Sequence, residues 1–280
     1  MLIIKDIYNL QTYLKAYRDK GHSIGYVPTM GALHEGHGSL IEKSRNDNQK
    51  TIISIFINEK QFNDAQDFEA YPRNKGDDYN FCEKHNVDII FEPSAGEIYP
   101  KEYQSIQNSH FKNILCDQYR PGHFDGVVTV LNRLFSIIES DKVYFGEKDF
   151  QQLKIVEKLI IQNKLKVNLV KCSSIRGLNG MSLSSRYTKL NTQEKTQFDK
   201  CAKIIDKNLL DLINSFDTKI LENIKKELQS IGISKIDDKT YGDIDNLDLE
   251  NFLSNRSPFP GGVGPITVSA LFYNLSILLN

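Results

Sequence analysis

The sequence predicts an α/β protein in which helices flank a buried parallel sheet. Two observations carry this prediction: short runs of β-branched and apolar residues alternate with stretches of helical periodicity, and polar residues gather where the runs end. Alternating strands and helices indicate βαβ units, which build parallel sheets. The five expected strands are 23–27, 51–57, 87–91, 142–145 and 166–170.

The expected helices lie between these strands, at 39–46, 127–140 and 150–163. The sequence changes character near residue 175: a lysine-rich segment, 193–230, predicts two further helices, and loop-rich sequence follows. We therefore expect a parallel-sheet domain over 1–175 and a smaller α+β region over 176–280.

Composition excludes several classes of function. A net charge of −1 over 280 residues gives no electrostatic basis for binding nucleic acid or a membrane surface. The sequence has no secretory signal pattern and no apolar run near the roughly 20 residues that span a bilayer. The cysteines, Cys82, Cys116, Cys172 and Cys201, lack metal-ligand spacing and predict reduced thiols. We expect a cytoplasmic protein.

Three of the expected strands end in polar or glycine-containing runs. These runs are 29–31 (ThrMetGly), 58–61 (AsnGluLysGln) and 146–149 (GlyGluLysAsp). Ligands of parallel α/β sheets bind beyond the carboxyl ends of the strands. The sequence thus predicts a nucleotide-type site assembled from several strand ends.

The strongest motif is ValProThrMetGlyAlaLeuHisGluGlyHis, residues 27–37. His34 and His37 are three residues apart where a strand passes into a helix, so both rings can lie on one side of the first turn. The free N–H groups and dipole of a helix N-terminus suit phosphate, and Gly31 and Gly36 allow close backbone approach. A lone histidine pair would favour two surface histidines on a turn; the whole string reverses that preference.

This segment resembles the signature of the pantothenate synthetases, which are nucleotidyltransferases of the HIGH-signature group with a Rossmann-like sheet. Further motifs similar to that family follow in order over about residues 1–190: 56–62, 71–73, 98–100, 120–130, 144–153 and 184–186. Seven ordered matches make coincidence implausible. The resemblance implies that residues 1–175 form a Rossmann-like catalytic domain that binds nucleotide and pantoate.

The resemblance implies a ligase that adenylates pantoate with ATP and then joins it to β-alanine, releasing pyrophosphate and AMP. It assigns catalysis to His34, His37, Lys148 and Arg186, with His37 as donor to the leaving pyrophosphate. The implied ATP-binding residues are Met30, Gly31, His34, His37, Gly146, Glu147, Lys148, Asp149, Ile175, Leu183, Ser184, Ser185 and Arg186.

The implied residues for pantoate and β-alanine are Gln61, Gln152, Asn58 and Thr29. An amide suits this task because it offers a donor and an acceptor without charge. The resemblance also implies Mg²⁺ on the ATP phosphates and a homodimer. Asp77 and Asp78 match an acidic pair assigned to the metal, but a solvated acidic turn explains them equally well.

The C-terminal region departs from the family. Residues 231–275 resemble the end of methylenetetrahydrofolate dehydrogenase/cyclohydrolases, although the sequence has no dinucleotide glycine fingerprint after a strand. We expect no folate activity, and the departure falls in the region that normally closes over the site in the resembled family. Within the matched region, Glu59 replaces a usual proline and Gly38 a usual larger residue.

Two alternatives to the pantoate-activating ligase stay open. One is a HIGH-signature nucleotidyltransferase for a different acid, against which Gln61 and Gln152 argue. The other is a non-catalytic or impaired family member whose altered C-terminal region serves binding or assembly.

Overall fold

The structure is a computed structural model that describes residues 1–113, 116–177 and 182–185, separate stretches between 191 and 230, and the pairs 234–235 and 255–256. The chain divides into two compact units. The first unit comprises Met1–His110, Gly122–Gly146 and Gln152–Cys172. The second comprises Phe111–Pro121, Glu147–Gln151 and Ser173–Asn280. Phe111–Pro121, Glu147–Gln151 and residues 173–175, all within the first 175 residues, therefore belong to the second unit.

The first unit is built on a six-stranded sheet of order β1-β4-β3-β2-β5-β6. Every neighbouring pair in it is parallel, which confirms the predicted α/β class. The strands are β1 (Leu2–Ile4), β2 (Ile24–Thr29), β3 (Lys50–Ile55), β4 (Ile89–Phe91), β5 (Lys142–Gly146) and β6 (Asn168–Cys172). The five expected strands all form, within a few residues of the expected bounds, and β1 is an additional edge strand.

The strand order reverses between β2 and β5. From β2 the chain builds β3 and β4 on one side, then crosses to add β5 and β6 on the other. In open parallel sheets this switch point leaves a crevice beyond the carboxyl ends of the two strands, where ligands bind. The ends of β2, β3 and β5, which carry the polar runs, are thus neighbours along one edge.

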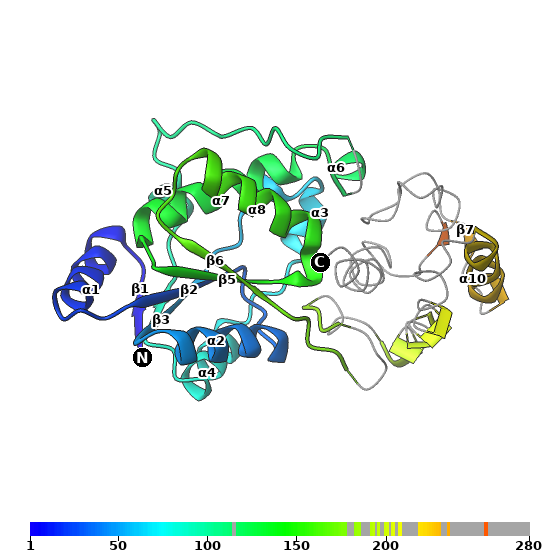
Figure 1. The fold of residues 1–280 in the computed structure, drawn as a ribbon, viewed down its shortest axis with the longest axis horizontal. Coiled ribbons are helices and arrows are strands. Elements are labelled where there is room, and N and C mark those ends of the chain that lie inside the picture. Colours follow the sequence, from blue (N-terminus) through cyan, green and yellow to red (C-terminus); the bar gives the residue numbers. More distant parts are fainter. Residues whose placement is uncertain are drawn as a thin grey trace. The chain divides into compact units, whose positions relative to one another are not determined.

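Helices cover both faces of this sheet. Figure 1 shows α2 (Glu35–Asp47) and α4 (Lys75–Lys84) on one face, and α7 (His123–Ile138) and α8 (Phe150–Gln162) on the other. The other described helices of this unit are α1 (Ile7–Asp19), α3 (Ala65–Glu69), α5 (Ala95–Ile98) and the 3₁₀ turn η1 (Glu59–Gln61). The expected helices 39–46, 127–140 and 150–163 correspond to α2, α7 and α8.

The second unit contains α6 (Cys116–Tyr119), η2 (Glu147–Asp149), α10 (Thr218–Ser230) and the pair β7 (Ser234–Lys235) and β8 (Asn255–Arg256). The described residues between 192 and 208 are helical, as expected for the first helix of the lysine-rich segment. Most of 231–280 lies outside the described residues, including nearly all of the segment likened to the folate enzyme.

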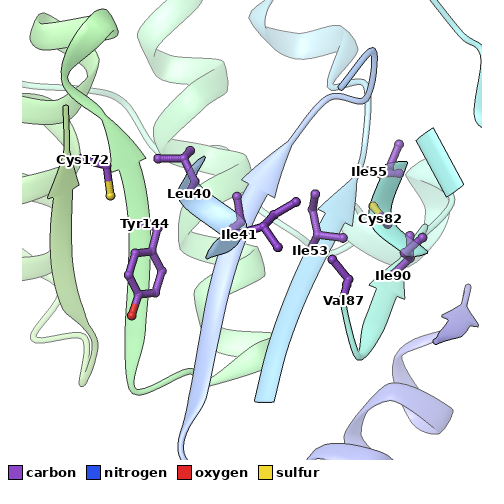
Figure 2. Close-up of a cluster of buried hydrophobic side chains, with 10 residues drawn as sticks. Leu40, Ile41, Ile53, Ile55, Cys82, Val87, Ile90, Tyr144 and Cys172 are labelled. Atoms are coloured by element: carbon purple, nitrogen blue, oxygen red, sulfur yellow. The ribbon is translucent and has the colours of Figure 1, made fainter. Parts of the chain in front are cut away.

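A buried apolar cluster fixes α2 and α4 on the sheet. It consists of side chains from β2 to β6, α2, α4 and the segment before β4: Val27, Leu40, Ile41, Ile53, Ile55, Cys82, Val87, Ile90, Tyr144 and Cys172. Figure 2 shows these side chains, with all but Val27 labelled. The four cysteines are free thiols. No helix within the described residues is both long and apolar enough to cross a membrane. Because α2 is packed on the sheet along its length, its first turn is held at the carboxyl edge.

Candidate active site

The turn between β2 and α2 has an unusual backbone. Gly31 has φ 79° and Ala32 has φ 52°, so two successive residues are left-handed. The hydroxyl of Thr29 donates to the Ser54 carbonyl at 2.7 Å and accepts from the Gly31 N–H at 3.2 Å. A Cβ on Gly31 would lie 2.8 Å from Oδ2 of Asp78. Glycine is therefore required here both by conformation and by space.

Asp78 of α4 holds this turn from outside it. Its Oδ2 accepts from the Ala32 N–H at 3.0 Å and its Oδ1 from the Leu33 N–H at 2.7 Å. The side chain is 4% exposed. Burial raises the pKa of Asp78, and the hydrogen bonds from Leu33 and Ala32 act in the opposite direction. The carboxylate of α4 thus anchors the loop that leads to the histidines.

His34 and His37 form a reciprocal cap at the start of α2. Nδ1 of His34 accepts from the Gly36 N–H at 3.1 Å, and Nδ1 of His37 accepts from the His34 N–H at 3.2 Å. The ring centroids are 4.2 Å apart. A nitrogen that accepts a hydrogen bond carries no proton, so each neutral ring has its proton on Nε2. The cap thus makes both rings donors at Nε2, which is the polarity that a phosphate oxygen requires.

Gln61 is oriented by its neighbours after β3. The Asn58 amide donates to Oε1 of Gln61 at 3.1 Å, and Nε2 of Gln61 contacts the Met30 sulfur at 3.0 Å. Asn58 is 1% exposed, and its own oxygen accepts from the Tyr99 hydroxyl at 2.7 Å. Burial raises the pKa of Tyr99, so the phenol stays protonated and remains a donor. The chain Tyr99–Asn58–Gln61 fixes which end of the Gln61 amide faces which way.

Helix α7 packs against the same loop. Nδ1 of His123 lies 2.6 Å from the Gln61 carbonyl and donates to it, because a carbonyl can only accept. Asn58 also donates to the Gly126 carbonyl at 3.1 Å. A Cβ on Gly126 would lie 2.4 Å from the Lys60 carbonyl oxygen, so the loop packs directly on the helix backbone.

Several further predicted residues lie at the end of β5 or shortly after it. Gly146 and Gln152 belong to the first unit, while Glu147, Lys148 and Asp149 belong to the second. Nζ of Lys148 lies 3.7 Å from Oδ1 of Asp149. The neighbouring Gln151 is buried and accepts from the Cys116 N–H at 2.9 Å, whereas Gln152 is half-buried. The side chain of Gln151 is thus engaged by a contact within the fold.

Another set of predicted residues lies further on in the second unit. The Leu183 N–H donates to the Ile175 carbonyl at 3.0 Å, and Arg176 and Ser182 form an antiparallel bridge. Ser184 and Ser185 follow and are half-buried. Arg186 lies outside the described residues. In this unit the structure therefore brings Leu183, which Ser184 and Ser185 follow directly, against Ile175.

The acidic pair fits a metal poorly. Both oxygens of Asp78 already accept backbone N–H groups, and exposed Asp77 accepts from the Asn74 amide. Across the described ranges there is no group of three His, Cys, Asp or Glu side chains that could hold a metal ion. These residues do not form a preorganised metal site.

The two departures noted in the sequence have local explanations. A Cβ on Gly38 would lie 2.7 Å from Cε1 of His85, so the His85 ring occupies the space that a larger residue would fill. Glu59 begins the turn η1, where its carbonyl accepts from the Phe62 N–H at 3.0 Å. The loop that carries Gln61 is thus ordered without proline.

Sequence reasoning missed the supporting contacts made by Asp78, Tyr99, His123 and Gly126. Tyr99 and His123 lie in short motifs that were recognised, but only the folded chain shows what they contact.

Comparison with known proteins agrees with the geometry. The family model described as pantoate-beta-alanine ligase matches residues 2–258, and so extends into the region likened to the folate enzyme. A pantothenate synthetase of Clostridium botulinum (strain Kyoto / Type A2) is 40% identical over 258 residues, 92% of this chain and 90% of the relative. One of Caldicellulosiruptor saccharolyticus is 37% identical, over 90% of this chain and 88% of the relative.

Solved structures are similar as well. The pantoate-beta-alanine ligase of Francisella tularensis, complexed with beta-gamma ATP and beta-alanine, has a TM-score of 0.74 at 32% identity, covering 85% of this chain and 90% of that one. The pantothenate synthetase of Thermus thermophilus has a TM-score of 0.73 at 29% identity, covering 85% of each chain. The chain therefore belongs to the pantoate–β-alanine ligase family.

Proposed function

We propose that the chain condenses (R)-pantoate with β-alanine in an ATP-dependent reaction, through a pantoyl adenylate, to give pantothenate, AMP and pyrophosphate. One observation carries the proposal: the capped pair His34 and His37 after β2, and the oriented amide of Gln61 after the neighbouring strand β3. The histidine pair, which suits phosphate, thus follows one strand. The uncharged amide of Gln61, which suits a small hydroxy acid, follows the adjacent strand. The reaction is a ligation, as in the pantoate–β-alanine ligase family.

In the first step a pantoate carboxylate oxygen attacks the α-phosphorus of ATP. A new P–O bond forms, the bond to the bridging oxygen breaks, and pyrophosphate leaves with that electron pair. Negative charge builds on the leaving group, so fixed donors should contribute most of the rate. The Nε2–H groups of His34 and His37 are such donors, and Lys148 and Arg186 are proposed to supply positive charge.

Adenosine recognition is proposed for the remaining residues of the set. Met30, Gly31 and Gly146 would allow the nucleotide to approach the backbone, and carboxylates are natural partners of ribose hydroxyls. The other members of the proposed set are Glu147, Asp149, Ile175, Leu183, Ser184 and Ser185.

Pantoate recognition is proposed for Gln61 and Gln152, with Asn58 and Thr29. A primary amide has two N–H donors and an oxygen with two lone pairs. Contacts with Asn58 and Met30 use one donor and one acceptor site of Gln61, which leaves one of each for a hydroxyl and a carboxylate.

The second step requires less of the protein. The amine of β-alanine attacks the carbonyl carbon of the adenylate and a C–N bond forms. The C–O bond to phosphate then breaks, AMP leaves with that electron pair, and the nitrogen releases a proton to solvent. The acyl group is already activated, so no protein nucleophile is needed.

Three further features belong to the proposal. Mg²⁺ is expected to accompany ATP as its counter-ion, because Mg²⁺ is commonly bound through substrate phosphates. We also propose a homodimer, to be tested by sedimentation of the purified chain, and a cytoplasmic location. Residues 1–175 are proposed as the catalytic domain and 176–280 as a lid-type domain.

The proposal is tested by mass-spectrometric detection of pantothenate and AMP from ATP, pantoate and β-alanine. We expect equimolar pantothenate and AMP, and a fall of about 10²–10³-fold in rate for Lys148→Ala, as for loss of one transition-state donor. The matched control is Lys158→Ala, at an exposed lysine on α8. Folded protein that forms no pantothenate would overturn the proposal and favour the non-catalytic alternative.

A further inference from the structure

The contact between Asp78 and the β2–α2 turn joins two elements that are distant in sequence. Asp78 lies in the first turn of α4, and its two oxygens accept from the consecutive N–H groups of Ala32 and Leu33 at 3.0 and 2.7 Å. Leu33 directly precedes His34, the residue that caps α2. One buried carboxylate therefore holds the backbone immediately before the histidine pair.

This turn needs an external partner. The left-handed φ angle of Ala32 (52°) is disfavoured because of its Cβ, whereas Gly31 adopts its φ of 79° readily. Such conformations persist where the surroundings determine them. Successive backbone N–H groups in a turn of this kind converge on an anion, and here the anion is a side chain of the protein itself.

We propose that Asp78 is a positioning residue for the adenylation step and not a magnesium ligand. It fixes residues 31–33, so that the His34 cap and the His37 ring are already in place when ATP binds. The proposal rests on the proposed function, since the step that it serves is the displacement of pyrophosphate.

The surroundings of Asp78 favour this role over metal binding. Its side chain is 4% exposed, and the backbone N–H groups already occupy one site on each oxygen. Its position in the first turn of α4 places it at the positive end of the helix dipole, which offsets the buried negative charge without a cation. Two further carboxylates, Asp77 and Glu92, repel the charge of Asp78, and Glu92 is neutralised by its ion pair with Lys75.

The decisive variant is Asp78→Asn, which keeps the size of the side chain. An amide has a single acceptor oxygen, so its NH₂ group must face one of the two backbone N–H groups. We expect kcat for pantoate-dependent pyrophosphate release to fall about 10- to 100-fold, because a small displacement of catalytic groups has effects of this size. The KM for pantoate and the Mg²⁺ concentration that gives half-maximal rate should be unchanged.

The matched control is Glu83→Gln, a carboxylate-to-amide change at an exposed position of the same helix, which should leave all three parameters unchanged. An Asp78→Asn variant whose activity returns at high Mg²⁺ would show a metal ligand and overturn the proposal. An unchanged kcat would overturn it as well.

A second measurement does not depend on activity and begins with the unmodified chain. Amide hydrogen exchange, followed by NMR on the unmodified chain, should show slow exchange at Ala32 and Leu33. In Asp78→Asn, these two amides should exchange at least about tenfold faster while the amides of β3 stay slow, whereas general destabilisation would affect both. Exchange of Ala32 and Leu33 at the unprotected rate in the unmodified chain contradicts the proposal even if the variant does not fold. Slow exchange without pantoate-dependent turnover would instead leave the contact of Asp78 with Ala32 and Leu33 in place and reject the proposed function.

Discussion

His37 caps the backbone of His34: its Nδ1 accepts from the His34 N–H at 3.2 Å, and Nδ1 of His34 in turn accepts from Gly36. The pair therefore has two tasks on opposite ring nitrogens. Nδ1 stabilises the start of α2, and Nε2 is the nitrogen that we propose as the donor to phosphate.

This division of tasks can be separated by mutation. Asparagine can place an oxygen near the former Nδ1, and glutamine can place an N–H near the former Nε2. His37→Asn should keep the melting temperature but lower adenylation at least about 100-fold. His37→Gln should retain more activity, but lose about 1 kcal/mol of cap stability and melt about 2–4 °C lower. Thermal unfolding and pyrophosphate release check both variants, and the opposite ranking would refute the division.

Tyr99→Phe should weaken pantoate binding although Tyr99 contacts Asn58 and acts on Gln61 only through it. The change leaves the buried Asn58 oxygen without its donor, which costs about 1–3 kcal/mol. We expect a rise of about tenfold in KM for pantoate and an unchanged KM for ATP, measured by initial rates. Tyr8→Phe, at a side chain that is 80% exposed, is the control. Equal effects on both KM values would contradict an effect that passes from Tyr99 through Asn58 to Gln61.

Gly126→Ala tests the packing of the Gln61 loop on α7. The added methyl would lie 2.4 Å from the Lys60 carbonyl oxygen and 2.7 Å from Cα of Gln61, and neither backbone atom can yield cheaply. We expect a loss of about 1–3 kcal/mol in the free energy of unfolding and a higher KM for pantoate. In Gly76→Ala, on α4, the nearest atom would be 3.8 Å away, so this control should not be destabilised. Urea unfolding distinguishes the two, and equal stabilities would disprove the close approach.

Glu92 should make stability fall in acid. Burial alone would raise its pKa, but the ion pair with Lys75 and the hydrogen bond from Tyr79 at 2.5 Å lower the pKa below its ordinary 4.5. A carboxylate with a lowered folded-state pKa contributes stability above its unfolded value, and this is lost as the pH falls through the folded value. The same hydrogen bond raises the pKa of Tyr79 to about 12, so the phenol remains its donor.

Glu92→Gln therefore should be less stable than the unmodified chain at about pH 7, and the difference should shrink below about pH 4.5. Urea unfolding at both pH values measures it. A stability difference that does not change with pH would show that Glu92 does not titrate in this way.

The sequence predicted the strands that lie in the core, because β-branched runs such as 51–57 reflect burial on both faces of the sheet. It did not predict β1, α1 or α4. Leu2–Ile4 is too short to show a pattern, and it forms a strand only by pairing with β4. Helix α1 buries only Leu10 and Leu14 among polar residues, and α4 buries only Asp78 and Cys82. Tertiary packing determines these elements more than local periodicity does.

For the candidate site, the sequence indicates the residues that we propose to contact substrate, but not the residues that support them. His34, His37 and Gln61 are readable because their motifs are contiguous. The role of Asp78 is not readable, since an acidic pair looks the same whether it binds a cation or the N–H groups of Ala32 and Leu33. The contact between Tyr99 and Asn58 spans 41 residues and exists only in the folded chain.

Activation of pantoate as an adenylate is the step on which the proposed function depends. The most direct measurement is pyrophosphate release from ATP and Mg²⁺, with pantoate and β-alanine omitted in turn. We expect a burst of about one pyrophosphate per site with pantoate alone, and continuous turnover to AMP and pantothenate only when β-alanine is added. Pyrophosphate release that does not depend on pantoate, or that is equally fast with other hydroxy acids, would contradict the activation of pantoate.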